Sequence, residues 1–128
     1  MSFATAINCM DGRTQLPVNE YLRQRLGVDH VDTITEAGPV RILAEDSHSA
    51  SAESILRRID ISVGKHKSQC IAVVAHHDCA GNPSNEETQK DQLRRAAQFL
   101  QSHYPSVQIL NLWVDSAWSV AEVAPERP

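Results

Sequence analysis

The sequence predicts an α/β fold with a small central parallel β-sheet, of about four strands, flanked by helices. First, short apolar runs typical of buried strands alternate with segments in which apolar residues recur at helical spacing. Second, the run Cys70–Ala75 is apolar throughout, as in a central strand covered on both faces. Strands and helices that alternate in this way form parallel sheets with helices packed on their faces.

The four predicted strands are short and lie well apart in the sequence. They are Phe3–Ile7, His30–Ile34, Cys70–Ala75 and Val107–Val114. Gly38 and Pro39 follow the second strand, and because both residue types interrupt regular structure we expect a surface loop there.

Three amphipathic helices are predicted between these strands. Their apolar positions are Val18, Tyr21, Leu22 and Leu26 in the first helix, Ala52, Ile55, Leu56, Ile59 and Val63 in the second, and Leu93, Ala96, Ala97 and Leu100 in the third. Gly27 and Gly64 stand where a left-handed residue ends a helix, and Asn85 stands where an N-cap begins one. Residues 124–128 are expected to form a frayed tail.

Length and composition limit the class of protein. The chain has 128 residues, of which 41% are hydrophobic, so we expect a single domain over residues 1–128. Its formal charge of −4, with Lys and Arg spread along the chain, argues against a nucleic-acid partner. No run approaches the roughly 18 apolar residues of a membrane span, and no signal-peptide pattern is visible. A cytoplasmic protein without membrane contact is therefore expected.

Metal-binding residue types follow two of the predicted strands. Cys9, Asp11 and Arg13 follow the first strand, and His76 and Cys79 follow the third. Because the carboxyl ends of parallel strands meet at one edge of a sheet, we expect these side chains to lie together. Thiolate and imidazole are preferred zinc donors, and three protein ligands leave a fourth position for water or a carboxylate. A lone His-x-x-Cys is more often a satisfied histidine beside a buried thiol, and the third donor, Cys9, favours zinc.

The two motifs resemble the signature of the β-class carbonic anhydrases, which is Cys-x-Asp-x-Arg after the first strand and His-x-x-Cys after a later one. The resemblance implies a zinc ion held by Cys9, His76 and Cys79, with an Asp11–Arg13 pair beside it. It also implies hydration of carbon dioxide to bicarbonate by a zinc-bound hydroxide, which is a lyase activity, in a homodimer or higher homo-oligomer.

The sequence departs from that family at several positions. Ala37-Gly38 matches a turn of the family, but Thr35-Glu36 stands where an Arg-Asn pair usually precedes it, and Cys79-Ala80-Gly81 replaces the usual Cys-Gly. The glutamine with which the family orients carbon dioxide has no clear counterpart, although Gln15 is a candidate. The metal site therefore transfers better than the substrate.

Two alternatives to carbon dioxide hydration stay open. A hydrolase of carbonyl sulfide or carbon disulfide would use the same metal on a similar linear molecule. A zinc-binding protein with a structural or regulatory role would keep Asp11 as a permanent fourth ligand, with Arg13 elsewhere. A bidentate contact between Arg13 and Asp11 would instead hold the carboxylate off the metal. The position of Arg13 therefore distinguishes an open from a closed site.

Three further residues near the motifs have less specific interpretations. His77 is expected to point away from the metal or toward the mouth of the site, where a proton-relay role is possible. Asp78 is expected to orient the turn between His76 and Cys79 through backbone hydrogen bonds. Cys70 begins a buried strand and is expected to be a small core residue.

Overall fold

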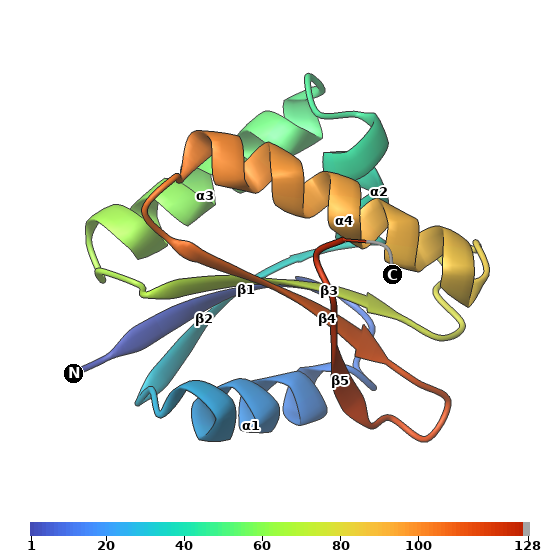
Figure 1. The fold of residues 1–128 in the computed structure, drawn as a ribbon, viewed down its shortest axis with the longest axis horizontal. Helices are drawn as coiled ribbons and strands as arrows, with labels where there is room; N and C mark the ends of the chain where they lie inside the picture. The colour runs from blue at the N-terminus through green and yellow to red at the C-terminus, as the bar shows by residue number, and fades with distance from the viewer. Residues whose placement is uncertain (127–128) are drawn as a thin grey trace.

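The computed structural model describes residues 1–126 and contains a five-stranded sheet (Figure 1). Its elements are β1 (Phe3–Cys9), α1 (Gln15–Leu26), β2 (His30–Glu36), α2 (Pro39–Glu45), α3 (Ala50–Gly64), β3 (Cys70–His76), α4 (Glu86–His103), β4 (Gln108–Val114) and β5 (Val120–Val123). The strands lie in the order β2-β1-β3-β4-β5; the first four are parallel, and β5 is antiparallel to β4. The predicted fold class is confirmed.

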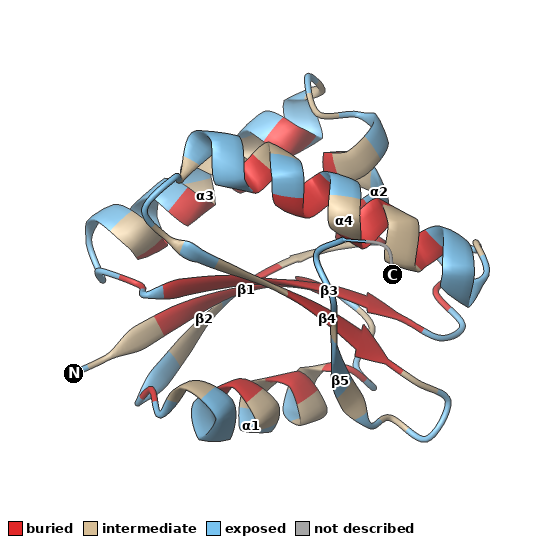
Figure 2. Ribbon diagram, viewed as in Figure 1, coloured by how far each residue is buried: buried red, intermediate tan, exposed pale blue. Residues whose placement is uncertain are grey.

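Helices cover both faces of the sheet. Figure 1 shows α1 on one face and α2, α3 and α4 on the other. The buried residues gather where these helices meet the sheet, and every residue of β3 is buried (Figure 2). Val18 and Leu22 of α1 pack against Ala72 and Val74 of β3 and their neighbours, which form the smaller of the two core clusters. The apolar stripes predicted for α1, α3 and α4 therefore face the core.

The position of β1 places the carboxyl ends of two strands where the direction of the strand order reverses. β1 lies between β2 and β3, and the chain reaches β2 through α1 on one face and β3 through α2 and α3 on the other. Such a reversal opens a crevice outside the carboxyl ends of the strands, where ligands of α/β proteins bind. Cys9 ends β1 and His76 ends β3 at this edge.

The segment after Gly38 is a helix, so the prediction of a surface loop was wrong. Pro39 is the first residue of α2, and Val40 and Leu43 are buried. Proline is favoured at the first helical position. Its fixed φ suits the helix, and an N–H group at that position would have no partner within the helix, so its absence costs nothing. Gly38 supplies the left-handed backbone before it, with φ 65°. The Gly-Pro pair therefore starts a helix here.

The helix ends follow the prediction in two of three cases. Gly27 caps α1 in the left-handed conformation, and the Asn85 side chain accepts a hydrogen bond from the Thr88 N–H at the start of α4. The cap predicted at Gly64 was wrong, because Gly64 is still helical, Lys65 follows it as the C-cap and the left-handed residue is Lys67.

The C-terminal part of the sheet contains a strand that the sequence pattern did not predict. β5 has four residues, none of them buried, so it carries little periodic signal. A frayed tail was predicted for residues 124–128. Its first residue, Ala124, accepts a hydrogen bond from Arg94 Nε at 3.3 Å, and Arg127 and Pro128 lie outside the described residues. Over residues 1–126, none of the helices combines the length and apolar character that crossing a bilayer requires.

Candidate metal centre

Three candidate metal donors meet at the carboxyl edge of the sheet. Cys9 and His76 come from the last positions of β1 and β3, and Cys79 lies three residues after His76. Their donor atoms all lie within 4.8 Å of one another, and all three residues are buried. The two Sγ atoms are 3.8 Å apart, and both cysteines are free thiols. The donors predicted from the two motifs are thus brought together and could hold a metal ion.

The orientation of the His76 ring suits a metal. Its Nδ1 lies 2.7 Å from the carbonyl oxygen of His77. Because a carbonyl oxygen only accepts, Nδ1 carries the proton, and the lone pair is on Nε2. Nε2 is buried and has no hydrogen-bond partner within residues 1–126. A buried acceptor without a partner is rare in folded proteins, and a cation between the three donors would satisfy it.

The surroundings of Cys9 favour its thiolate form. A hydrogen bond from Cys79 holds the pKa of Cys9 well below its usual range, against the opposing effect of burial, and backbone groups of Gly38 and Asp11 lower it further. The same contact and burial raise the pKa of Cys79. Thiolates are the form in which cysteine binds zinc, so the site is prepared for a cation at one sulfur at least.

Asp11 pairs with Arg13 instead of joining the donors. Arg13 donates from Nε to Oδ1 at 3.0 Å and from Nη2 to Oδ2 at 2.7 Å, which is a bidentate contact. These bonds lower the pKa of Asp11 to about 2 and raise that of Arg13. Asp11 is not part of the cluster whose donor atoms lie within 4.8 Å of one another. Three candidate donors thus lie together, and Arg13 holds the Asp11 carboxylate to one side of them.

The loops around the donors meet in a close contact between backbones. A Cβ atom on Gly81 would lie 2.6 Å from the carbonyl carbon of Ala37, and one on Gly38 would lie 2.8 Å from the Cβ of Asn82. Contacts this short exclude any side chain at Gly38 and Gly81 unless the loops separate. Ala80 separates Cys79 from Gly81, and Gly81 is the residue at which the loop after β3 meets the loop after β2.

Gln15 shapes the loop that carries Cys9. Its Nε2 donates to the carbonyl oxygens of Cys9 at 2.7 Å and Asp11 at 3.1 Å. The amide nitrogen, the group with which a glutamine would orient carbon dioxide, is therefore engaged with the backbone. The structure assigns Gln15 to the support of the loop.

Polar residues on α4, which the sequence pattern did not predict, hold the end of β3 and the loop that follows it. Gln89 accepts from the His76 N–H at 3.3 Å and donates to the His76 carbonyl at 3.0 Å, so it holds the end of β3 from both sides. Gln92 accepts from Asn82 Nδ2 at 2.7 Å and donates to Glu45 at 2.9 Å. Gln89 and Gln92 continue the apolar stripe of α4 toward its start at helical spacing. The signal available in the sequence was two glutamines at positions of the helical repeat that otherwise carry apolar residues.

The remaining residues near the motifs have mixed outcomes. Cys70 is fully buried at the start of β3, which confirms its assignment to the core. Asp78 has a positive φ of 58°, and its carboxylate accepts from Arg13 Nη1 at 3.3 Å, so the contact seen for its side chain is with Arg13. His77 is exposed, and its carbonyl oxygen accepts a hydrogen bond from His76 Nδ1.

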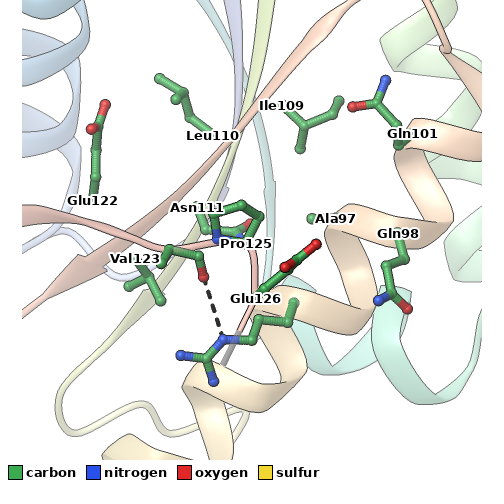
Figure 3. A pocket seen from close by; sticks show the side chains of 12 residues that line it. Ala97, Gln98, Gln101, Ile109, Leu110, Asn111, Glu122, Val123, Pro125 and Glu126 are labelled. Atoms are coloured by element: carbon green, nitrogen blue, oxygen red, sulfur yellow. Dashed lines mark hydrogen bonds between the residues drawn. The ribbon is translucent and has the colours of Figure 1, made fainter. Parts of the chain in front are cut away.

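A separate pocket lies between α4 and the β4–β5 pair (Figure 3). Its volume is about 570 Å³, and its walls include Gln98, Asn111 and Pro125. Arg94 and Ala124 also line it, and Arg94 Nε donates to the carbonyl oxygen of Ala124 at 3.3 Å. No cysteine or histidine lines this pocket, so it is distinct from the metal centre.

Fold and site together define an α/β protein with a buried Cys-His-Cys centre that could hold a metal. A family model described as "Putative carbonic anhydrase" matches residues 1–124. The chain therefore belongs to this family, and the resemblance to β-class carbonic anhydrases in the two motifs is confirmed. No curated protein matches the chain in sequence.

Solved structures of carbonic anhydrases share the fold. The enzyme from Streptococcus mutans has a TM-score of 0.67 at 17% identity, and that from Glaciozyma antarctica has 0.63 at 16%; each match covers 94% of this chain and 81% of the other. Two tetrameric β-carbonic anhydrases from Sordaria macrospora are represented by a match with a TM-score of 0.55 at 12% identity, which covers 94% of this chain and 80% of the other. At these identities the likeness shows the fold.

Proposed function

We propose that the protein is a zinc-dependent carbonic anhydrase, a lyase that hydrates carbon dioxide to bicarbonate. The observation that carries the proposal is the bidentate contact of Arg13 with Asp11, with the carboxylate outside the cluster of three donors. A fourth protein ligand would close a tetrahedral zinc site, whereas three donors leave a position for a reacting group. Membership of the carbonic anhydrase family supports the same activity.

The donor set fits zinc. Cys9, His76 and Cys79 supply two sulfurs and an imidazole nitrogen, which zinc prefers over the oxygen ligands of calcium or magnesium. Zinc held there would supply a coordinated water of lowered pKa, and two thiolate ligands would keep that pKa above the value of about 7 found with three histidines. Two observations support a cation there: His76 Nε2 has no hydrogen-bond partner within residues 1–126, and the pKa of Cys9 is lowered toward its thiolate form.

Asp11 is the residue that we propose to act beside the metal. Its two carboxylate oxygens are fixed by Arg13, and its low pKa keeps it ionised throughout the neutral range. An ionised carboxylate in a fixed position can accept a hydrogen bond from the reacting group and so orient it. Arg13 in turn keeps the carboxylate from turning toward the donors.

Stopped-flow measurement of carbon dioxide hydration by the zinc-loaded protein tests the proposal. We expect zinc-dependent turnover that rises from neutral to alkaline pH and is absent from the Cys9→Ser variant. Zinc bound at stoichiometric amount without turnover would identify a zinc protein with a structural or regulatory role. Turnover of carbonyl sulfide or carbon disulfide in place of carbon dioxide would identify the hydrolase.

Substitution of Asp11 tests its role separately from the metal. We expect Asp11→Ala to keep zinc and to lose turnover by about 100-fold, because the group that orients the reaction is missing while the three donors remain. The measurement is kcat/KM together with the zinc content of the same sample. Wild-type turnover in this variant would remove Asp11 from the mechanism.

Assembly and location belong to the same proposal. We infer that the chain forms a homodimer or a larger homo-oligomer, as the tetrameric enzymes from Sordaria macrospora do; light scattering coupled to gel filtration tests this. Three free cysteines suit a reducing compartment, which supports a cytoplasmic location.

A further inference from the structure

Trp118, in the loop between β4 and β5, lies on the guanidinium of Arg13. The Cζ atom of Arg13 is 4.4 Å from the centroid of the Trp118 ring, within the range of a cation–π contact. The same ring lies 6.3 Å from the imidazole ring of His76, centroid to centroid. Trp118 therefore stands beside both the Asp11–Arg13 pair and a candidate metal donor, although neither motif includes it.

The backbone of the loop is held in an unfavourable conformation at Trp118. Its φ is 61°, in the left-handed region that bulky residues avoid. Asp115 enforces this turn: its Oδ1 accepts from the N–H groups of Ala117 and Ser119, and its carbonyl accepts from the N–H of Trp118 at 2.9 Å. A glycine or asparagine would take this conformation with less strain. The position instead carries the largest side chain, which points to a use for the ring.

The Arg13 guanidinium contacts two carboxylates through its N–H groups and the Trp118 ring through its central carbon. One edge is bidentate to Asp11, and Nη1 on another edge reaches the Asp78 carboxylate at 3.3 Å. The Trp118 ring covers one face. Both ion pairs are exposed to water, because the Arg13 side chain is 47% exposed, so hydrogen bonds alone hold the guanidinium weakly. With Cζ 4.4 Å from its centroid, the Trp118 ring limits how far the guanidinium can turn, and so helps to set the direction of both edges.

We propose that Trp118 is a positioning residue of the metal centre: its ring holds the Arg13 guanidinium against Asp11 and so keeps the Asp11 carboxylate away from the donors. Its effect on turnover rests on the proposed carbonic anhydrase activity, whereas its effect on Arg13 does not. With the ring absent, the guanidinium is free to move toward Asp78, and Asp11 is free to turn.

Nuclear magnetic resonance of the zinc-loaded protein tests the contact without any reaction. The Nε–H resonance of Arg13, identified by its absence in Arg13→Ala, should be shifted upfield by the ring current of Trp118. We expect Trp118→Leu to abolish this shift, Trp118→Phe to retain part of it, and Ser116→Ala, an exposed position of the same loop, to leave it unchanged. An Arg13 resonance with the same shift in Trp118→Leu and wild type would overturn the proposal.

A double-mutant cycle tests the consequence for the reaction. We expect Trp118→Leu to lower kcat by about tenfold at unchanged zinc content, and to have no further effect in an Arg13→Ala background, because the ring acts through Arg13. Trp118→Phe should restore most of kcat, which a merely structural defect of the loop would not predict. Equal losses in the two backgrounds would overturn the proposal. A wild type without turnover would refute the proposed function, and the Arg13 resonance would still decide the role of Trp118.

Discussion

The two ends of the sheet both gather buried polar side chains, but only one end satisfies them internally. Toward the amino ends of the strands, the Ser62 hydroxyl of α3 lies 2.6 Å from Thr5 Oγ1, 2.6 Å from Ser68 Oγ and 2.7 Å from Asp32 Oδ2. The Ser62 hydroxyl uses its only hydrogen to donate to the Asp32 carboxylate. The hydroxyls of Thr5 and Ser68 therefore donate to the oxygen of Ser62. We call Thr5, Asp32, Ser62 and Ser68 the amino-end cluster.

The carboxyl end differs in what it leaves unpaired. His76 Nε2 has no partner within residues 1–126, and the Cys9 and Cys79 sulfurs contact each other. A hydroxyl that uses its single donor and both lone pairs, as Ser62 does, needs no further ligand. A buried lone pair beside a thiolate does need one. The comparison shows how a polar cluster with all its hydrogen bonds made differs from one that could hold a metal, and four measurements can break or sharpen it.

The largest difference should appear when zinc is added. For wild type, free zinc at about 1,000 times its dissociation constant should raise the free energy of unfolding by about 4 kcal/mol, because the metal binds only the folded donors. Cys9→Ser should lose most of this gain, and Ser62→Ala should keep it. Urea unfolding with and without zinc measures the gain. A Cys9→Ser protein that zinc stabilises as much as wild type would contradict the assignment.

The next effect concerns the contact between the two loops at the carboxyl end. Gly81→Ala should lower the free energy of unfolding by about 2 kcal/mol, because the new Cβ would lie 2.6 Å from the Ala37 backbone and force the loops apart. Gly12→Ala is the matched control, since nothing lies within 4 Å of a Cβ at that position. Equal midpoints of urea unfolding for the two variants would show that the loops are not in close contact.

Ser62→Ala should have a smaller effect that is confined to the amino-end cluster. Removing the hydroxyl leaves three buried or partly buried partners with one hydrogen bond fewer, and we expect a loss of about 1–2 kcal/mol in the free energy of unfolding. Ser51→Ala, an exposed serine on the same helix, is the control and should change little. Zinc content should stay at the wild-type value. Reduced zinc in Ser62→Ala would mean that the two ends are coupled.

The last effect is absent at neutral pH and appears only in alkali, as a dependence of stability on pH that comes from Cys70. Burial raises the pKa of this thiol to about 12, whereas in the unfolded chain it ionises near pH 9. Above pH 9 the unfolded state therefore loses the proton first, and the free energy of unfolding falls as pH rises from about 9 to about 12. Cys70→Ala should remove this part of the decline. Identical pH profiles for the variant and wild type would contradict it.

Much of the architecture was predictable because its signals are local. The apolar strand Cys70–Ala75, the stripe of α4 and the caps at Gly27 and Asn85 all appear in the structure at the expected places. The elements that were missed are those whose signal is short or ambiguous. α2 begins with the same Gly38-Pro39 pair that often ends regular structure, and β5 has only four residues without a buried position.

The contacts that Gln89 and Trp118 make with the site could not be predicted, because they join residues that are far apart in the sequence. Gln89 lies 13 positions from His76 in the sequence, and it reaches both backbone groups of that residue. Trp118 lies 105 positions from Arg13 and covers its guanidinium. Polar and aromatic side chains of this kind have many compatible environments, so the residue type alone does not reveal the partner.

The sequence by itself determined the fold class, the family resemblance and the three candidate donors, because strand periodicity and the spacing of Cys9, His76 and Cys79 are properties of the chain. Only the tertiary structure decided how the donors and the Asp11–Arg13 pair are arranged. The direction of a carboxylate, the tautomer of His76 and the stacking of Arg13 on Trp118 depend on hydrogen bonds and contacts between segments that folding brings together. Those contacts leave Asp11 outside the donor cluster.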